Sequence, residues 1–282
     1  MPELPEVETV VRGLARALTG KRLERLDLAR PDLRSAIPPG LAAQIAGKRI
    51  ERFSRRAKYI LMHFEGAKPS EGGVVIAHLG MSGRLIIVPP GNAMPREKHD
   101  HAVFHFEDGT ELRLNDARRF GLLDYDEEAH LAEHPRFHHL GPEPLSNEFN
   151  GPSLAESLHG KKTPIKSALL DQRVVAGIGN IYACEALYGA GLSPRRLAKT
   201  VQGERAERLA TAIHDVLTRA IAAGGSSLRD YVQTSGELGY FQHHWAVYGK
   251  EGERCPGCDC KSGIRRLVQS GRSTFYCPKR QK

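Results

Sequence analysis

A proline and two glutamates stand at the start of the chain, in the stretch MPELPEVET. Because Pro2 is small, we expect Met1 to be removed, which leaves a secondary amine that can attack an electrophilic carbon and form an iminium. An ordinary α-amino group titrates at about 7.7–8.0, so a nearby helix N-terminus needs to lower its pKa only modestly. Glu3 is placed to act as general acid or base, and Glu6 follows one helical turn later. The alternative is that these acids merely complement the helix dipole.

Four of the five cysteines gather near the end of the chain, at Cys255, Cys258, Cys260 and Cys277. The first residues lack the basic and apolar regions of a signal peptide, so we expect a cytoplasmic protein. In a reducing compartment such a cluster more often binds metal than forms disulfides. The fifth, Cys184, falls in a helical pattern and is expected to be a buried structural thiol.

The chain carries a formal net charge of +8, which favours a polyanionic partner, nucleic acid first. Residues 243–282 hold nine basic and three acidic residues, a net charge of +6. A solubilising tail is one interpretation, but cysteines and glycines interleaved with the charges favour a folded basic module. The sequence contains no run of about 18 apolar residues, so we predict no membrane span.

The elements that must position these residues form three regions. Apolar residues at helical spacing predict a helix from about residue 4 to Gly20, and β-branched segments with an Asp108-Gly109 turn predict antiparallel strands. We therefore predict an α+β protein with an antiparallel β-sandwich flanked by helices over residues 1–133 and a Pro/Gly-rich linker over 134–153. A helical domain would follow over 154–242, and a zinc-finger-like β-hairpin module over 243–282.

Six stretches, taken together, resemble the formamidopyrimidine-DNA glycosylases, which are bacterial base-excision repair enzymes for oxidised purines. The stretches run in family order along nearly the whole chain: MPELPEVETV, RRAKYIL (55–61), HLGMSG (78–83), NDARRFG (115–121), LLDQRVVAGIGNIYACEAL (169–187) and GRSTFYCP (271–278). The resemblance implies a bifunctional glycosylase and lyase that acts on damaged double-stranded DNA. It implies a monomer without membrane attachment or nucleotide cofactor.

The resemblance also assigns the chemistry. Pro2 would attack C1′ of the damaged nucleotide and form a Schiff base, and β- and then δ-elimination would cut the strand. Glu3 would protonate or hydrogen-bond the opening sugar ring, with Glu6 as a supporting carboxylate. Lys58 would contact a phosphate or the lesion, although an ordinary surface lysine is the alternative.

A base must leave the duplex before chemistry at its sugar. By resemblance, Met81, Arg118 and Phe120 would fill the gap and hold the orphaned base, and Arg119 would bind a phosphate. Taken alone, Met81 and Phe120 would more often be core residues.

Further DNA contacts are expected in the second half of the chain. Residues 166–190 are similar to the helix–two-turn–helix element of the family, with Asn180 capping the second helix at an anion-binding N-terminus. An ordinary helical hairpin is the alternative. The segment 224–242 would close over the flipped lesion, and Arg272 would bind phosphates from a hairpin turn.

The cysteine module departs from the family pattern, because Arg280 stands where a fourth cysteine is expected. In one reading Cys260 replaces the missing ligand and the chain binds one Zn²⁺ through four thiolates. Zinc could instead be bound weakly or with a foreign ligand, or the hairpin could hold no metal. Two functional alternatives also stay open: an endonuclease VIII-like enzyme for oxidised pyrimidines, and a non-catalytic binder of damaged DNA.

Overall fold

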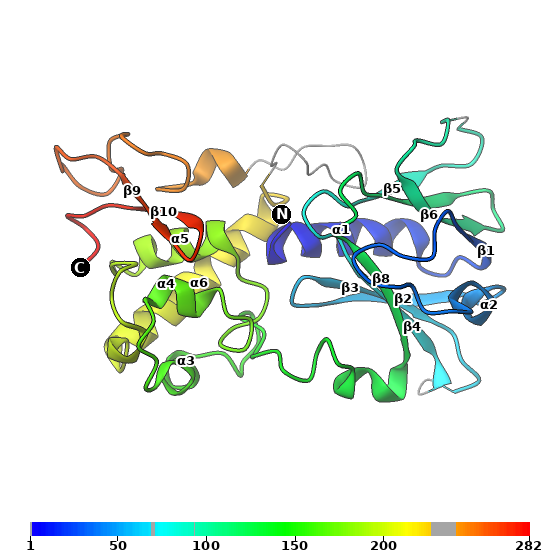
Figure 1. Ribbon diagram of the computed structural model, residues 1–282, viewed down its shortest axis with the longest axis horizontal. Coiled ribbons are helices and arrows are strands. Elements are labelled where there is room, and N and C mark those ends of the chain that lie inside the picture. Colours follow the sequence, from blue (N-terminus) through cyan, green and yellow to red (C-terminus); the bar gives the residue numbers. More distant parts are fainter. Residues whose placement is uncertain (1, 69–70, 93, 227–240) are drawn as a thin grey trace. The chain divides into compact units, whose positions relative to one another are not determined.

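The computed structural model describes residues 2–68, 71–92, 94–226 and 241–282. The chain divides into two compact units, each with its own core. The first unit comprises residues 1–138 and 224–240, and the second comprises residues 139–223 and 241–282. Figure 1 traces the elements of both units in chain order.

The first unit is built from two four-stranded antiparallel sheets, as predicted. One sheet has the strand order β1-β6-β7-β5, and the other has the order β2-β3-β4-β8. The strands are β1 (Leu23–Leu28), β2 (Ile50–Arg56), β3 (Tyr59–Phe64), β4 (Gly73–His78), β5 (Arg84–Val88), β6 (Asp100–Phe106), β7 (Glu111–Asn115) and β8 (Leu122–Glu127). The short elements α2 (Leu41–Ile45) and η2 (Glu128–Glu133) complete the unit.

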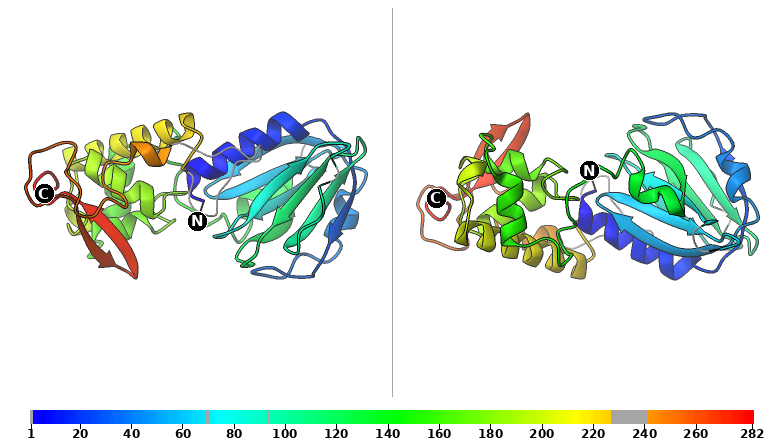
Figure 2. Two further views of the ribbon diagram at one scale, coloured as in Figure 1. Left: turned by 90° about the horizontal axis from the view of Figure 1, so that it is seen from above. Right: turned by 90° about the horizontal axis from the view of Figure 1, so that it is seen from below.

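Both sheets and the first helix, α1 (Leu4–Leu18), share one apolar core. Side chains alternate along each strand, so every second residue faces this core. In β3, for example, Ile60, Met62 and Phe64 belong to it. Figure 2 shows the two sheets of this unit edge-on, with α1 running along them.

Three loops leave this sandwich at the same end. Tyr59 of β3 pairs with His78 of β4, which pairs in turn with Leu122 of β8. In the other sheet, Arg84 of β5 pairs with Asn115 of β7. The β2–β3 turn, the β4–β5 loop and the β7–β8 loop therefore lie together, although 57 residues separate the first from the last.

The N-terminal turns of α1 lie beside that end as well. Glu8 of α1 forms an ion pair with Arg55, the residue before the end of β2, at 3.0 Å. The prediction of a helix from about residue 4 to Gly20 is confirmed, and Gly20 takes a left-handed conformation just after the helix ends. The start of the chain and the three loops thus share one edge of the unit.

The second unit is mainly helical. It contains α3 (Gly151–Leu158), α4 (Ile165–Leu169), α5 (Asn180–Gly189), α6 (Glu204–Ala222), the short η3 (Ala198–Thr200) and η4 (Phe241–His244), and the hairpin strands β9 (Arg265–Gln269) and β10 (Arg272–Tyr276). Both α3 and α5 pack against α6, and α5 also contacts β10. As predicted, Cys184 is buried in α5.

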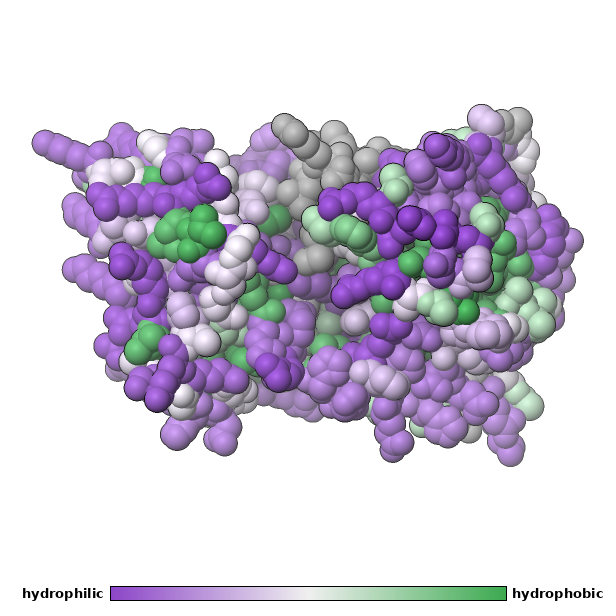
Figure 3. Space-filling model, in the orientation of Figure 1, coloured by the Kyte–Doolittle hydropathy of each residue, from purple (hydrophilic) through white to green (hydrophobic). Residues whose placement is uncertain are grey.

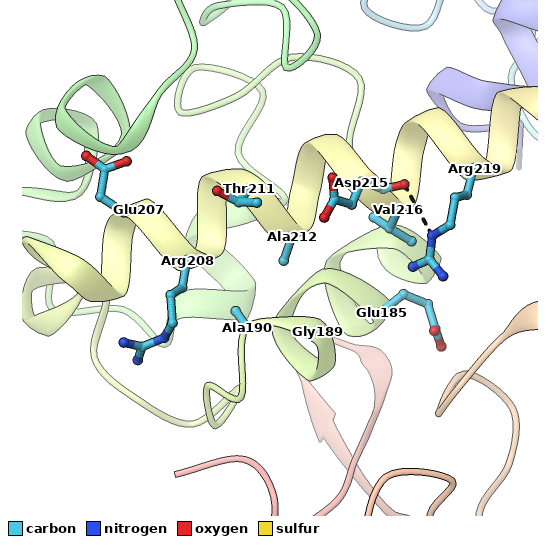
Figure 4. Close-up of a pocket in the computed structure, with 10 residues that line it drawn as sticks. All are labelled: Glu185, Gly189, Ala190, Glu207, Arg208, Thr211, Ala212, Asp215, Val216 and Arg219. Atoms are coloured by element: carbon cyan, nitrogen blue, oxygen red, sulfur yellow. Dashed lines mark hydrogen bonds between the residues drawn. The ribbon is translucent and has the colours of Figure 1, made fainter.

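Hydrophilic residues make up most of the surface in view in Figure 3. No helix in the described part of the chain is long and apolar enough to cross a membrane. A pocket of about 350 Å³ lies along α5 and α6 (Figure 4), and its polar lining mixes acids and cations: Glu185, Glu207, Arg208, Asp215 and Arg219. This mixture favours neither an anionic nor a cationic ligand.

A buried carboxylate joins α5 to the segment that leads into the cysteine module. Glu185 accepts hydrogen bonds from the backbone N–H groups of Ala246, Val247 and Tyr248, at 2.8–2.9 Å. Burial is the main cause that raises the pKa of Glu185, and these three donors act in the opposite direction. The three bonds fix where the segment crosses α5.

Glu185→Ala should therefore destabilise the second unit by about 3 kcal/mol, because it leaves three buried N–H groups without acceptors. Urea unfolding measures the loss. Glu156→Ala, at an exposed position in α3, is the matched control and should change the free energy of unfolding by less than about 0.5 kcal/mol. Equal effects of the two substitutions would contradict this role for Glu185.

Candidate active site and metal centre

Pro2 and Glu3 are both buried, directly before the first turn of α1. The Glu6 side chain, which is fully buried, accepts the backbone N–H of Glu3 at 2.9 Å. Its other oxygen accepts the backbone N–H of Ser226 at 2.8 Å. Glu6 therefore holds the residue next to Pro2 and also residue 226, which lies near the start of the segment 224–242 that is predicted to close over a ligand. Residues 227–240 of that segment lie outside the described residues.

Lys58 sits in the turn between β2 and β3, only 8 % exposed, so it is not an ordinary surface lysine. Burial is the main cause that lowers the pKa of His78 to about 4, and the positive charge of Lys58 comes next. His78 is therefore neutral near pH 7, and its Nδ1 accepts the backbone N–H of Gly80 at 2.9 Å. This bond fixes the start of the β4–β5 loop.

Two large apolar side chains stand in solvent at the same end of the sandwich. Met81 is 38 % exposed in the β4–β5 loop, and Phe120 is 42 % exposed in the β7–β8 loop. The interpretation of these two as core residues is therefore wrong. The Arg118 guanidinium lies over the Phe120 ring, 4.7 Å from its centroid, and Arg119 has a left-handed backbone with φ of 55°.

Asp116 ties these two loops together. It is fully buried, and its carboxylate accepts the Ser82 hydroxyl at 2.6 Å and the Gly121 backbone N–H at 2.7 Å. Ser82 directly follows Met81, and Gly121 directly follows Phe120. One buried carboxylate thus sets the spacing of the two exposed apolar side chains.

The loops also meet backbone to backbone at Gly80. Its φ is +59°, and a Cβ there would come within 2.3–2.5 Å of backbone atoms of Phe120 and Gly121. Only glycine fits such a contact, since real Cβ atoms do not approach backbone so closely. The close approach and the Asp116 bonds make the two loops one rigid platform.

In the second unit, a glycine-containing turn joins α4 to α5. Gln172 braces it by accepting the Gly177 N–H at 2.8 Å and donating to the Ile178 carbonyl at 2.9 Å. The prediction that Asn180 caps α5 is wrong: Gly179 occupies the cap position and Asn180 is the first helical residue. The Asn180 amide instead donates to the Ser273 carbonyl of β10 at 2.9 Å, because α5 packs on that strand.

Arg272 lies at the hairpin turn, as predicted. It is the first residue of β10, directly after Ser270 and Gly271, which both have a positive φ. Its side chain is exposed. Together with the bond from Asn180, this geometry presents a cation at the hairpin tip while α5 holds the strand.

The four C-terminal cysteines converge on one point. Their sulfur atoms all lie within 4.8 Å of one another, and Cys277 Sγ is 3.5 Å from both Cys258 Sγ and Cys260 Sγ. Four sulfurs bound tetrahedrally to one Zn²⁺ at about 2.3 Å lie about 3.8 Å apart. The cluster therefore fits a metal ion such as zinc, and Cys260 belongs to it.

Sequence reasoning did not single out Asp116, His78 or Glu185. Asp116 stands within NDARRFG, where an acid two residues before a pair of arginines and a phenylalanine was an available signal. Its partner Ser82 is 34 residues away. The partners of His78 and Glu185 likewise became visible only in the folded chain.

Replacing Asp116 with asparagine should loosen this platform, because an amide cannot accept from both Ser82 and Gly121 in the same orientation. We expect a loss of about 1–3 kcal/mol in the free energy of unfolding and faster hydrogen exchange at the Gly121 amide. Glu24→Gln on the exposed face of β1 is the control. Unchanged exchange at Gly121 would refute the coupling of the two loops.

Comparison with known proteins matches this arrangement to one family. Residues 1–123 match the model of the formamidopyrimidine-DNA glycosylase N-terminal domain, and residues 140–232 match that of its H2TH domain. The chain is 57 % identical to the formamidopyrimidine-DNA glycosylase of Rhodospirillum centenum and 52 % identical to that of Dinoroseobacter shibae, with full coverage of both chains in each case.

Solved structures agree with the sequence relatives. The MutM (Fpg) protein from Thermus thermophilus superimposes with a TM-score of 0.86 at 39 % identity, covering 99 % of this chain and 98 % of that one. A Lactococcus lactis Fpg mutant in complex with DNA containing Fapy-dG gives a TM-score of 0.89 at 33 % identity, with full coverage of both. On these grounds, and with its own site geometry in agreement, the chain belongs to the formamidopyrimidine-DNA glycosylase family.

Proposed function

We propose that this protein is a base-excision repair enzyme that removes oxidised purines from duplex DNA and then cleaves the strand. One observation carries the proposal: the buried Pro2–Glu3 start of α1 lies at the same end of the sandwich as exposed Met81 and Phe120. A nucleophile and a gap-filling platform are the two parts that such an enzyme needs beside each other. Its substrate is chromosomal DNA, so it would work in the cytoplasm.

The reaction begins at the Pro2 nitrogen, once Met1 has been removed. Its lone pair attacks C1′ as the bond from C1′ to the base breaks, and the base leaves with a proton. Glu3 donates a proton to the ring oxygen O4′ as the C1′–O4′ bond opens, and an iminium remains on Pro2. Loss of a C2′ proton then expels the 3′ phosphate, and a second elimination expels the 5′ phosphate.

Glu6 and Lys58 support this centre in different ways. Glu6 holds the Glu3 backbone through a 2.9 Å hydrogen bond, and the Glu3 side chain accepts the Glu6 backbone N–H in return, so the two residues fix each other at the start of α1. Lys58 adds a positive charge at the same end of the sandwich, where a DNA phosphate or the damaged nucleotide would lie. Both residues are buried, so their positions are fixed before DNA arrives.

Base flipping would be the task of the two-loop platform. Met81 and Phe120 replace the stacking lost when the damaged base leaves, and Arg118 exchanges its contact with the Phe120 ring for the edge of the widowed base. Arg119 and Arg272 would bind phosphates, as would the backbone N–H groups at the start of α5 near Asn180. Most of the affinity then comes from phosphates and falls with salt.

We further propose that Cys255, Cys258, Cys260 and Cys277 bind one Zn²⁺. The support is the convergence of four sulfurs within 4.8 Å. A structural zinc of this kind would cross-link the loop that carries the first three cysteines to the end of β10, and would thereby stabilise the hairpin that presents Arg272.

Borohydride trapping on a duplex with one 8-oxoguanine opposite cytosine tests the nucleophile. We expect a covalent adduct that peptide mapping assigns to an N-terminal Pro2. Pro2→Gly and Glu3→Gln should lose strand cleavage by at least about a thousandfold and retain duplex binding, because neither side chain supplies phosphate contacts. An adduct on a lysine would exclude Pro2 as the nucleophile.

Two comparisons sharpen this test. Arg272→Ala should weaken binding to damaged and undamaged duplexes alike, the reverse of the Pro2 result. A panel of damaged bases addresses the second candidate, an oxidised-pyrimidine activity, since a Lactococcus lactis Fpg has been solved with an oxidised pyrimidine in its DNA. Faster turnover of pyrimidines than of 8-oxoguanine would favour that candidate.

Cys260→Ser tests the ligand set. Metal analysis of the wild-type chain should give about one zinc per chain, and the substitution should lower zinc retention after dialysis against a chelator. Cys184→Ala, which removes a buried thiol of α5 outside the cluster, is the control and should retain zinc. Full zinc retention in Cys260→Ser would show that Cys260 is not a ligand.

A further inference from the structure

A tyrosine and an arginine cover the loop that carries three of the four clustered cysteines. Tyr188, near the end of α5, is 8 % exposed, and its hydroxyl lies 3.4 Å from Cys255 Sγ. The Arg280 guanidinium lies over the Tyr188 ring, 4.9 Å from its centroid. The hydroxyl thus lies within hydrogen-bond distance of the sulfur, and a cation lies over the ring that carries it.

Arg280 also contacts both parts of the chain that supply sulfurs. Its Nη1 donates to the Gly257 carbonyl in the cysteine loop at 3.4 Å, and its backbone N–H donates to Cys277 Sγ at 3.4 Å. The Cys277 backbone N–H donates to the side-chain oxygen of Gln281 at 2.8 Å. The residues after Cys277 therefore turn back over the cluster.

The loop leaves no spare room under this cover. A Cβ at Gly257 would come within 2.5 Å of the Tyr188 hydroxyl and 2.7 Å of Arg280 Nη1. Both atoms are the ends of side chains, so a larger residue at position 257 would displace the Tyr188 and Arg280 side chains from the loop. These two side chains therefore lie directly against the loop backbone.

The spacing of the cysteines explains why this loop needs support. Cys255, Cys258 and Cys260 fall within six residues, so three ligands come from one short loop and only Cys277 comes from the hairpin strand. Three of the four metal–sulfur bonds would then go to this loop, and only the bond to Cys277 would connect the metal to another part of the chain. Hydrogen bonds to ligand atoms from outside the first shell orient such ligands and stabilise their charge.

We propose that Tyr188 and Arg280 are positioning residues for a Zn²⁺ bound by these cysteines, and that they fix the metal-bearing loop to α5. This inference rests on the proposed zinc site. The Tyr188 hydroxyl donates to the Cys255 thiolate, and Arg280 holds the ring while its charge offsets the excess negative charge of four thiolates around one divalent ion.

The helix α5, which carries Tyr188, also contacts the β9–β10 hairpin that we propose binds DNA. The Asn180 amide, at the start of α5, donates to the Ser273 carbonyl of β10, and Glu185 holds the segment from Ala246 to Tyr248. A metal loop fixed to Tyr188 therefore shares one rigid support with the strand that begins at Arg272. The pair Tyr188–Arg280 would link metal binding to the position of that cation.

The test compares Tyr188→Phe and Arg280→Ala with Lys279→Ala, an exposed neighbouring cation, in the full chain. Zinc is titrated against a chromogenic chelator at fixed pH. We expect the first two variants to bind zinc about 10- to 100-fold more weakly and Lys279→Ala to match the wild type. The Co²⁺-loaded wild type should show a thiolate-to-cobalt absorption band that shifts in Tyr188→Phe, because one thiolate loses a hydrogen-bond donor.

The outcomes separate this inference from the zinc site itself. A wild-type chain that retains no metal would overturn both. A wild type with one zinc, together with unchanged affinity and an unchanged cobalt band in Tyr188→Phe, would overturn the positioning role alone. So would an affinity loss matched by an equal loss of thermal stability in the metal-depleted protein, since that would indicate packing and not an effect on the ligand.

Discussion

Among the described residues, three buried carboxylates accept hydrogen bonds that hold a candidate functional segment in place. Glu6 holds the backbone of Glu3 and of Ser226. Asp116 joins the loops that carry Met81 and Phe120. Glu185 gathers three N–H groups of the segment that precedes the cysteine module. An enzyme whose reacting parts lie on loops needs such anchors, because loops have few internal hydrogen bonds of their own.

This choice of anchor has a physical reason. Burying a carboxylate costs free energy unless hydrogen bonds compensate the lost hydration. The carboxylate therefore stays beside its donors and resists displacement. It can also accept two or three bonds from different segments, which an apolar side chain cannot do. Exposed side chains such as Met81 and Phe120 can then contact DNA, because other residues hold their loops in place. Met81 and Phe120 can remain in solvent because Asp116, and not their own burial, sets the platform.

The cysteine module is held in place in a different way. Three of its sulfurs come from one short loop and the fourth from the end of β10, beside a small apolar cluster that includes Val247, Ile264 and Phe275, so a metal would reinforce that small core. Tyr188 and Arg280 then connect that centre to α5, the helix that also contacts β10. The first unit thus relies on sheet register and buried acids, while the hairpin of the second packs against α5 and ends beside four converging cysteine sulfurs.

The sequence by itself determined the helix at the start, the antiparallel strands around Asp108-Gly109, the helical second half and the family. These features depend on local periodicity, turn residues and short motifs, which a single sequence displays. It also indicated Cys260 as a candidate metal ligand, and the folded chain places its sulfur beside those of the other three cysteines. Only the tertiary structure decided the partners of Asp116 and Glu185, the exposure of Met81 and Phe120, and the role of Asn180, which contacts β10 instead of capping its helix. These depend on strand register and helix packing, which bring together residues 34, 61 or 93 positions apart. No local pattern in the chain encodes such pairings.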